Sequence, residues 1–270
     1  MKRNIYLKTI PPAEAVARVK ASIDREALIR EETIPSHEAS GRVLAHAVHA
    51  RYSSPTFHSA AMDGYAVNAR STFAAREGHP LTLKAGETCF AVNTGHPMPE
   101  GCDAVIMIEQ VMLDGGSVTI EAPAFPWQHV RRIGEDIVAT ELLFPRNHQL
   151  RPWDVGALLS GGIWDVPVWE RVTVRIIPTG DEVLDFTTHP DPGKGQVVES
   201  NSQMLAALAR ELGCVVERAA PVPDNPEALH QALKDSLDAG RHLTIFCAGS
   251  SAGSKDFTRA TLEKLSLIHI

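Results

Sequence analysis

The chain has 270 residues, 44% of them hydrophobic and 22% charged. The length fits two globular domains or one large one, and the composition argues against wholesale disorder. The 26 Lys and Arg residues against 33 Asp and Glu residues give a net charge of −7, which disfavours general nucleic-acid binding.

The chain shows no signal of a membrane or secreted protein. No apolar run approaches the ~18–20 residues of a membrane span, and the first residues carry no apolar signal core. None of the four cysteines forms a CxxC pair. We therefore expect a cytoplasmic protein with reduced thiols rather than disulfides or a zinc site.

The first 170 residues predict a β-rich insert between two mixed segments. A helix is predicted to start at Pro11–Pro12, because apolar residues recur at helical spacing from Val16 to Ala27. A strand is predicted at 41–50. From 51 to 146 short strand-like runs alternate with turns, and DGGS at 114–117 predicts a hairpin turn. Pro152 can open a helix that Gly161 closes, before a strand over 164–169.

From residue 171 onward, strands and helices alternate, which predicts a parallel sheet with right-handed crossovers. The predicted strands lie at 172–177, 214–220 and 242–247, and the predicted helices at 201–212, 226–239 and 256–265. Ser200 or Asn201 is expected to cap the first of these helices. The stretch 185–195, DFTTHPDPGKG, is the most loop-like region.

Ligands bind at the carboxyl ends of strands in such sheets. The three strand ends read PTGDE at 178–182, PVPDN at 221–225 and AGSSAGSKD at 248–256. Each carries a carboxylate, and the third has small residues that let backbone N–H groups approach an oxyanion. Each loop alone is more often structural, but together they suggest a divalent cation bridging carboxylates to phosphate.

Two common nucleotide-binding patterns are absent from the third loop. It is neither a Walker A loop nor GxGxxG, which weakens nucleotide hydrolase and dinucleotide oxidoreductase functions. In the insert, SAAMDGYAV at 59–67 places Asp63 before a glycine. By itself this pattern favours a hairpin with a capping aspartate over a carboxylate presented at a cleft.

SSPTFHSAAMDGYAV at 53–67 resembles the MoeA family of molybdopterin molybdenumtransferases, to which the C-terminal part of gephyrin is similar. Further motifs fit the family in order: GRVLA at 41–45, NTGHPMPEGCDAVIMIE at 93–109, VRRIGEDI at 130–137, PTGDEV at 178–183, ESNSQML at 199–205, PDNPEAL at 223–229 and GSSAGSKDF at 249–257. The resemblance covers nearly the whole chain.

The resemblance implies an α/β multidomain fold and a domain plan. The expected parts are an N-terminal helix at 1–30 packing with the α/β domain, a linker domain at 31–50 and 147–170, a β-rich lid domain at 51–146 and an incomplete MogA-like parallel α/β domain at 171–264. The family forms an elongated homodimer in which the lid of one subunit meets the α/β domain of the other.

The implied activity is the Mg²⁺-dependent insertion of molybdenum from molybdate into adenylylated molybdopterin with release of AMP. A MogA-like molybdopterin adenylyltransferase would supply the substrate. Matched by motif, the expected catalytic residues are Asp63, Glu182 and Asp256, and the metal ligands are Glu182 and Asp256. The expected substrate-binding residues are Thr94, Asp136, Asp224, Gly249, Ser251, Gly253 and Lys255.

Some positions stay open. Arg131 and Arg132 could be solvated charges or phosphate contacts in equal measure, and His58 receives no ligand role. The family's third loop reads roughly GGVSVGDxD, whereas this chain has Ala248 and Ser254 in place of a glycine and an acid. A less negative pocket could change metal dependence or let Lys255 hold phosphate.

Similar SAGSxD loops resemble those of MoeA relatives fused to a periplasmic-binding-protein-like domain. A non-catalytic sensor or regulatory module is therefore the alternative function, while an unrelated nucleotide-binding α/β protein is disfavoured by the missing P-loop. The family continues past the third-loop helix, so we expect the chain to be truncated. LSLIHI at 265–270 also matches one reading frame of a transposase adaptor and is expected to be a non-native tail rather than an ordinary apolar strand or helix end.

Overall fold

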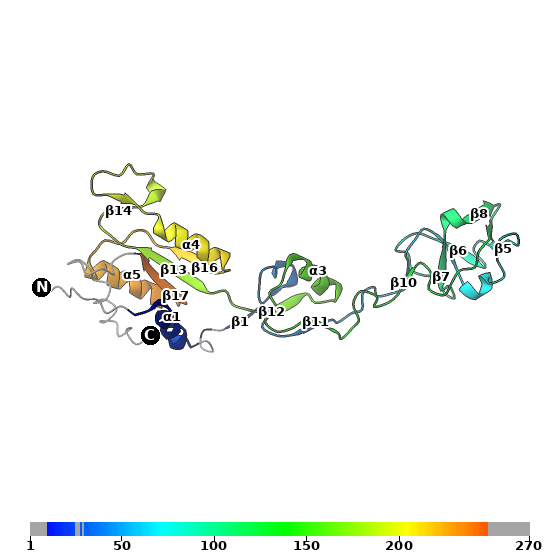
Figure 1. The fold of residues 1–270 in the computed structure, drawn as a ribbon, viewed down its shortest axis with the longest axis horizontal. Helices are drawn as coiled ribbons and strands as arrows, with labels where there is room; N and C mark the ends of the chain where they lie inside the picture. The colour runs from blue at the N-terminus through cyan, green and yellow to red at the C-terminus, as the bar shows by residue number, and fades with distance from the viewer. Residues whose placement is uncertain (1–9, 25–27, 29, 248–270) are drawn as a thin grey trace. The chain divides into compact units, whose positions relative to one another are not determined.

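The computed structural model describes residues 10–24, 28 and 30–247. The chain divides into two compact units, residues 33–168 and residues 1–32 with 169–270, here called the central unit and the α/β unit. Figure 1 shows the elements of both. Among the helices in the described ranges, none combines the length and hydropathy of a membrane span.

The α/β unit is built on a three-stranded parallel sheet. Its strands are, in spatial order, β16 (Val215–Arg218), β13 (Thr173–Pro178) and β17 (Leu243–Cys247). The central strand pairs in parallel with both neighbours, from Thr173 opposite Val215 to Pro178 opposite Cys247. The predicted parallel sheet is confirmed for these strands, whose β-branched runs suit a buried sheet.

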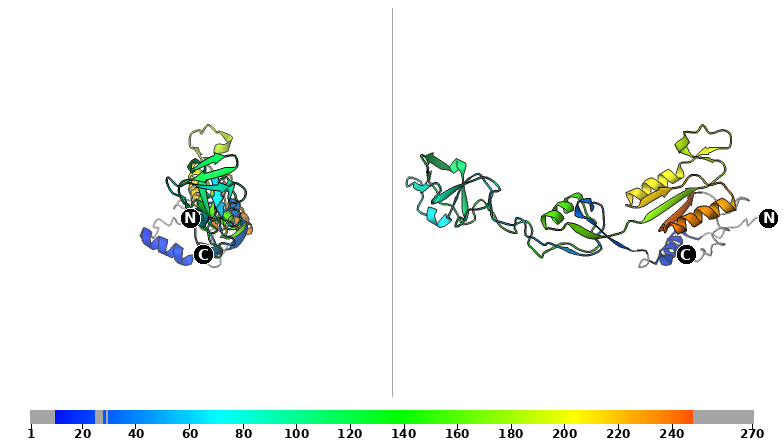
Figure 2. Two further views of the ribbon diagram at one scale, coloured as in Figure 1. Left: turned by 90° about the vertical axis from the view of Figure 1, so that its right-hand side faces the viewer. Right: turned by 180° about the vertical axis from the view of Figure 1, so that it is seen from behind.

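The helices of the α/β unit are α1 (Pro12–Ser22), α4 (Asn201–Glu211) and α5 (Pro226–Asp238). Of these, α4 and α5 cover opposite faces of the sheet (Figures 1 and 2). Ala206 of α4 is fully buried in a cluster that includes Ile245 of β17. Side chains alternate along a strand, so Thr244 points the other way, where its Oγ1 lies 2.5 Å from the Ser236 hydroxyl of α5.

The start of α4 differs from the predicted cap. Ser200 precedes the helix but makes no side-chain capping hydrogen bond. Instead, the Oε1 atom of Glu199 accepts a 2.7 Å hydrogen bond from the Ser202 backbone N–H. The longer glutamate side chain reaches into the first turn and satisfies a donor that lacks an intrahelical partner. In α5, Asn225 caps by accepting from the Ala228 N–H at 2.7 Å.

Between β13 and α4 the chain makes an excursion away from the three-stranded sheet (Figure 1). This excursion contains β14 (Val183–Leu184), the 3-10 turn η4 (Phe186–Thr188) and β15 (Val197–Val198). The two short strands pair in parallel. Between η4 and β15 the residues are mostly exposed, in keeping with the loop predicted there.

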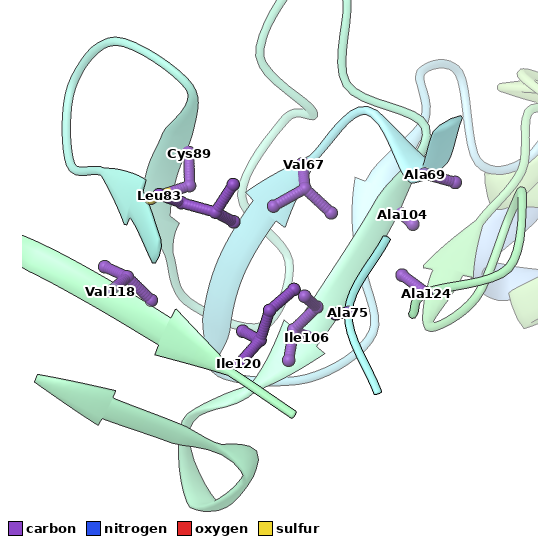
Figure 3. Close-up of a cluster of buried hydrophobic side chains, with 10 residues drawn as sticks. All are labelled: Val67, Ala69, Ala75, Leu83, Cys89, Ala104, Ile106, Val118, Ile120 and Ala124. Atoms are coloured by element: carbon purple, nitrogen blue, oxygen red, sulfur yellow. The ribbon is translucent and has the colours of Figure 1, made fainter. Parts of the chain in front are cut away.

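The β-rich part of the central unit consists of two antiparallel sheets. One sheet orders β6 (Cys89–Val92), β4 (Gly64–Val67) and β7 (Ala104–Met107), and the other orders β5 (Leu81–Lys84), β9 (Ser117–Ile120) and β8 (Val111–Asp114). Figure 3 shows side chains of both, including Val67, Ile106 and Ile120, filling one buried cluster. The predicted hairpin turn is confirmed, with Gly115 and Gly116 at φ 51° and 92°.

The remaining elements of the central unit are short. They are β1 (Glu31–Pro35) paired with β12 (Asp165–Trp169), β2 (Val48–His49) with β11 (Leu142–Phe144), β3 (Ser59–Ala60) with β10 (Val130–Arg131), the helix α3 (Pro152–Ser160) and the 3-10 turns η1 (Ser36–Glu38), η2 (Ala69–Thr72) and η3 (Ile108–Gln110). The helix after Pro152 is confirmed and ends at Gly161.

The strand predicted over 41–50 is largely wrong. Only β2 lies within it, together with isolated bridges from Val43 to Gln149 and from Leu44 to Val168. These partners come from two separate segments, so no continuous ladder forms. The apolar pattern instead reflects burial, because Leu44 is fully buried in a cluster with Leu158 of α3.

A buried carboxylate stabilises the first turn of α3. Asp154 is 3% exposed, and its Oδ2 accepts from the Arg151 N–H at 2.9 Å and contacts Nε2 of His148 at 2.8 Å. The Arg151 guanidinium also contacts both carboxylate oxygens, at 3.1 and 3.3 Å. His148 stacks on Phe144, with ring centroids 4.8 Å apart. This cluster connects α3 to the segment that precedes it.

Candidate functional site

Asp63 in the central unit is held by a residue far along the chain. It lies in the turn before β4, and its Oδ1 accepts hydrogen bonds from the Thr94 N–H at 2.7 Å and the Thr94 hydroxyl at 2.9 Å. Its own carbonyl accepts from the Ile108 N–H at 3.0 Å. The side chain therefore links two loops rather than capping its own turn, contrary to what the local pattern alone favours.

The hydrogen bonds from Thr94 favour the ionised form of Asp63. The backbone N–H of Thr94 lowers the pKa of the Asp63 carboxyl most, and the Thr94 hydroxyl lowers it further. Partial burial raises the pKa slightly, and the charge of His96 lowers it. Asp63 is exposed, so its ionised carboxylate can bind a cation or orient a polar ligand.

Replacing Thr94 with valine is expected to raise the pKa of Asp63 toward its ordinary value without reaching it. The variant loses the hydroxyl hydrogen bond but keeps the stronger one from the backbone N–H. An NMR titration of the Asp63 carboxyl measures this change, with Thr82→Val on the same unit as the control. An unchanged pKa would show that the hydroxyl does not reach Asp63 in solution.

Asp136 is engaged with an arginine. Its two oxygens accept from Nη2 of Arg131 at 2.7 and 2.6 Å, and Glu135 lies 3.7 Å from the same guanidinium. Arg131 is thus an ion-paired residue rather than a free charge. Within the described part of the chain, no hydrogen bond joins Asp136 to Asp63 or Thr94.

His58 is occupied by packing. Its Nδ1 accepts from the Ile133 N–H at 3.1 Å, and its ring centroid lies 4.8 Å from that of Trp127. These two contacts give His58 a packing role between separate segments of the central unit. Arg132 donates its backbone N–H to Glu135 at 3.0 Å, which fixes the backbone and leaves the side chain outside this hydrogen bond.

In the α/β unit, the first two predicted strand ends meet at one edge of the sheet. The Gly180 N–H donates to the Val222 carbonyl at 3.1 Å, and the Asp224 N–H donates to Oδ1 of Asp181 at 3.0 Å. Glu182 folds back over Gly180, since a Cβ added there would lie 3.1 Å from both carboxylate oxygens. The structure thus brings the Glu182 and Asp224 loops together, as their strand-end positions predict.

The third strand end reaches the same edge. The Thr179 N–H donates to the Cys247 carbonyl at 3.0 Å, so β17 ends beside the start of the first loop. The predicted residues Gly249, Ser251, Gly253, Lys255 and Asp256 lie outside the described residues, as does the helix predicted at 256–265.

The donor atoms at this edge suit a hard cation. Carboxylate oxygens are the ligands that Mg²⁺ prefers, usually one or two of them together with substrate oxygens. Asp181, Glu182 and Asp224 supply that chemistry from adjacent loops. Over the described ranges no three His, Cys, Asp or Glu side chains converge closely enough to hold a metal ion by themselves.

Sequence reasoning missed a charged network beside this edge. Arg218, at the end of β16, contacts Asp185, Glu199 and Ser202 from a guanidinium that is 13% exposed. These partners lie 16 to 33 residues away in the sequence. The local sequence signal for this network is Glu199, the first residue of ESNSQML, and the family motif alone assigns it no role.

Two segments of the chain match known protein families. Residues 10–162 match the MoeA N-terminal region (domain I and II), and residues 175–267 match the family described as "Probable molybdopterin binding domain". The first match alone spans more than half of the chain.

Curated relatives carry related names. The chain is 30% identical over 250 residues to the molybdopterin molybdenumtransferase of Synechococcus elongatus, which covers 87% of this chain and 62% of that protein. It is 34% identical over 247 residues to molybdopterin molybdenumtransferase 2 of Mycobacterium tuberculosis, which covers 85% of this chain and 60% of that protein. The chain thus spans about 60% of the length of these relatives.

Solved structures agree with the sequence matches. Two structures of molybdopterin biosynthesis MoeA proteins from Pyrococcus horikoshii superpose with TM-scores of 0.75 and 0.74, at 26% and 30% identity. They cover 96% and 88% of this chain, which in turn covers 67% and 66% of theirs. The α/β multidomain fold is therefore confirmed, with a MogA-like α/β domain. Because the two family segments match in order and the fold agrees with both solved structures, the chain belongs to the MoeA family.

Proposed function

We propose that the protein inserts molybdenum from molybdate into adenylylated molybdopterin, with release of AMP. Family membership and the printed names of the curated relatives support this activity. The match of residues 175–267 to a molybdopterin-binding family supports the substrate class.

The observation that carries the proposal is the Asp63–Thr94 pair. An exposed carboxylate that is kept ionised by two hydrogen bonds is fixed in direction and available to a ligand. Such a group can accept hydrogen bonds from a ligand or orient an oxyanion through an intervening cation. We assign Asp63 a catalytic role and Thr94 the role of holding it and contacting substrate.

Glu182 and Asp256 are the residues that would hold Mg²⁺, and both also belong to the proposed catalytic set. When bound, the cation supplies positive charge against the phosphates of the adenylylated substrate. Asp136, Asp224, Gly249, Ser251, Gly253 and Lys255 form the proposed substrate-binding set. Lys255 would add a second positive charge for phosphate.

Hydrophobic clusters support the proposed domain plan. Two clusters draw on residues 60–130, in the proposed lid, and one draws on residues 39–48 and 150–168, in the proposed linker. A fourth draws on residues 174–247, in the proposed MogA-like domain. Leu143 and Phe144 pack on the linker cluster and β11 pairs with β2, so we place residues 142–146 with the linker.

The proposal extends to partners and compartment. A homodimer and a MogA-like adenylyltransferase as substrate donor follow from the family resemblance. The four cysteines carry free thiols, which is in keeping with a reducing, cytoplasmic compartment.

Asp63→Asn and Glu182→Gln are each expected to lower the rate of molybdenum insertion by about ten- to a hundredfold while leaving the fold intact. The assay combines full-length protein, adenylylated molybdopterin, Mg²⁺ and molybdate, and follows AMP release. Asp114→Asn removes a carboxylate from the β8–β9 hairpin of the central unit and serves as the charge-matched control.

Two results would count against the proposal. Full activity in both site variants would contradict the assignment of the site. Binding of adenylylated molybdopterin without AMP release by the unsubstituted protein would instead support the sensor alternative.

A further inference from the structure

Arg218 occupies a central place in the α/β unit. Its Nη2 lies 3.0 Å from Oδ1 of Asp185, and its Nη1 lies 3.3 Å from Oδ2, so the contact is bidentate. Its Nε donates to the Ser202 hydroxyl at 2.9 Å, and Nη2 lies 3.5 Å from Oε2 of Glu199. The Phe186 ring covers the guanidinium at 4.6 Å.

These contacts join both ends of the excursion between β13 and α4. Asp185 directly follows β14, and Glu199 directly follows β15. The strands themselves share only two residue pairs. A pairing that short is not stable in water without outside support. The polar contacts of Arg218 supply that support from a third strand.

Glu182 belongs to the excursion, and its backbone is hydrogen-bonded to β15. The carbonyl of Glu182 accepts from the Val197 N–H at 3.0 Å, and the carbonyl of Leu184 accepts from the Glu199 N–H at 2.9 Å. The position of Glu182 therefore depends on the β14–β15 pairing. That pairing in turn depends on where Asp185 and Glu199 are held.

The chemistry of the network requires an arginine. Two carboxylates share one guanidinium in a half-buried setting, and the side chain of Glu199 is only 3% exposed. A planar fork can bind Asp185 with two nitrogens and Ser202 with a third, whereas a lysine ammonium is a point charge. Loss of the guanidinium would leave Glu199 buried with Ser202 as its remaining partner in the network.

We propose that Arg218 is a positioning residue for Glu182, because it holds the β14–β15 pairing that sets the Glu182 backbone at the carboxyl edge of the sheet. The consequence for turnover rests on the proposed function of Glu182. The structural coupling from Arg218 to the Val197 and Glu199 amides does not depend on that proposed function.

Amide hydrogen exchange of Val197 and Glu199 tests the coupling directly. In Arg218→Met both amides are expected to exchange about tenfold faster or more, because charge-assisted hydrogen bonds are lost. In Arg218→Lys the exchange rates are expected to lie between those of the unsubstituted protein and those of Arg218→Met. The lysine variant still tests the coupling if the methionine variant does not fold. Arg241→Met removes a 2.7 Å ion pair with Glu217, the neighbour of Arg218 in β16, whose side chain lies on the opposite face of the sheet. This control variant should leave both amides unchanged.

A double-mutant cycle on AMP release tests the path through Glu182. Arg218→Met is expected to lower kcat about tenfold in the full-length protein and to have little further effect in the Glu182→Gln background. Exchange rates unchanged from those of the unsubstituted protein, or rate effects that simply multiply, would overturn the inference. A Glu182→Gln variant with full activity, alongside faster exchange in Arg218→Met, would instead refute the proposed site and leave the coupling standing.

Discussion

Replacing Gly64 with alanine is expected to destabilise the β6-β4-β7 sheet by more than about 3 kcal/mol. A Cβ at this position would lie 2.0 Å from the Ile106 carbonyl oxygen and 2.9 Å from its carbon. The obstacle is backbone, so no side-chain rotation relieves it. Gly64 pairs with Val92 on one side and Met107 on the other, so β4 cannot shift without losing ladder contacts.

Urea unfolding of the purified protein measures this loss through the midpoint and slope of the central unit's transition. Gly156→Ala is the matched control, because this glycine lies inside α3 with open space around its Cβ position. The control is expected to be neutral or to stabilise by about 0.5–1 kcal/mol. A Gly64→Ala midpoint equal to that of the unsubstituted protein would show that β4 and β7 do not approach this closely.

Replacing Asp154 with asparagine is expected to cost about 2 kcal/mol at neutral pH, and the loss should disappear in strong acid. Burial raises the pKa of this carboxyl, but hydrogen bonds from the Arg151 side chain, His148 and the Arg151 N–H, with the Arg151 charge, outweigh it. The net pKa falls from 3.8 to about 2. A difference of this size corresponds to about 2 kcal/mol of folding stability.

The direction of the pH effect follows from this lowered value. The unfolded chain binds the proton more readily than the folded chain, so the carboxylate stabilises the fold fully above pH 3.8. That stabilisation is lost as the pH falls through about 2. Urea titrations at several pH values compare the variant with the unsubstituted protein. Asp165→Asn, at the exposed first position of β12, should change stability by no more than about 0.5 kcal/mol. A pH-independent deficit in Asp154→Asn would contradict the assigned cause.

Local patterns predicted the strands and helices of the α/β unit well, although the cap predicted for α4 was wrong. The strand around Ile176 and the helix beginning at Pro226 follow from apolar periodicity and a proline start, which act within a few residues. The same reasoning failed at 41–50, where Leu44 is buried by packing from separate segments rather than by a ladder. A run of apolar residues indicates that a segment is buried, but a buried segment need not pair as a β-strand.

The sequence could predict which loops carry the residues of the candidate site, but it could not predict the contacts that these residues make. Strand-end reasoning placed Glu182 and Asp224 at one edge, because parallel strands end together. The Asp63–Thr94 hydrogen bonds span 31 residues, and their geometry depends on how two loops of the central unit meet. The Arg218 network is equally non-local, and no single segment of sequence contains enough of its partners to reveal it.

The way Arg218 holds both ends of the excursion has a practical consequence for residues 189–196. Their backbone lies between two anchored strands and is mostly exposed. Lengthening a loop whose ends are already fixed costs little, about 0.6 kcal/mol for each doubling. This stretch is therefore the place in the α/β unit to insert an affinity tag or attach a fluorophore without moving the carboxylates at the sheet edge.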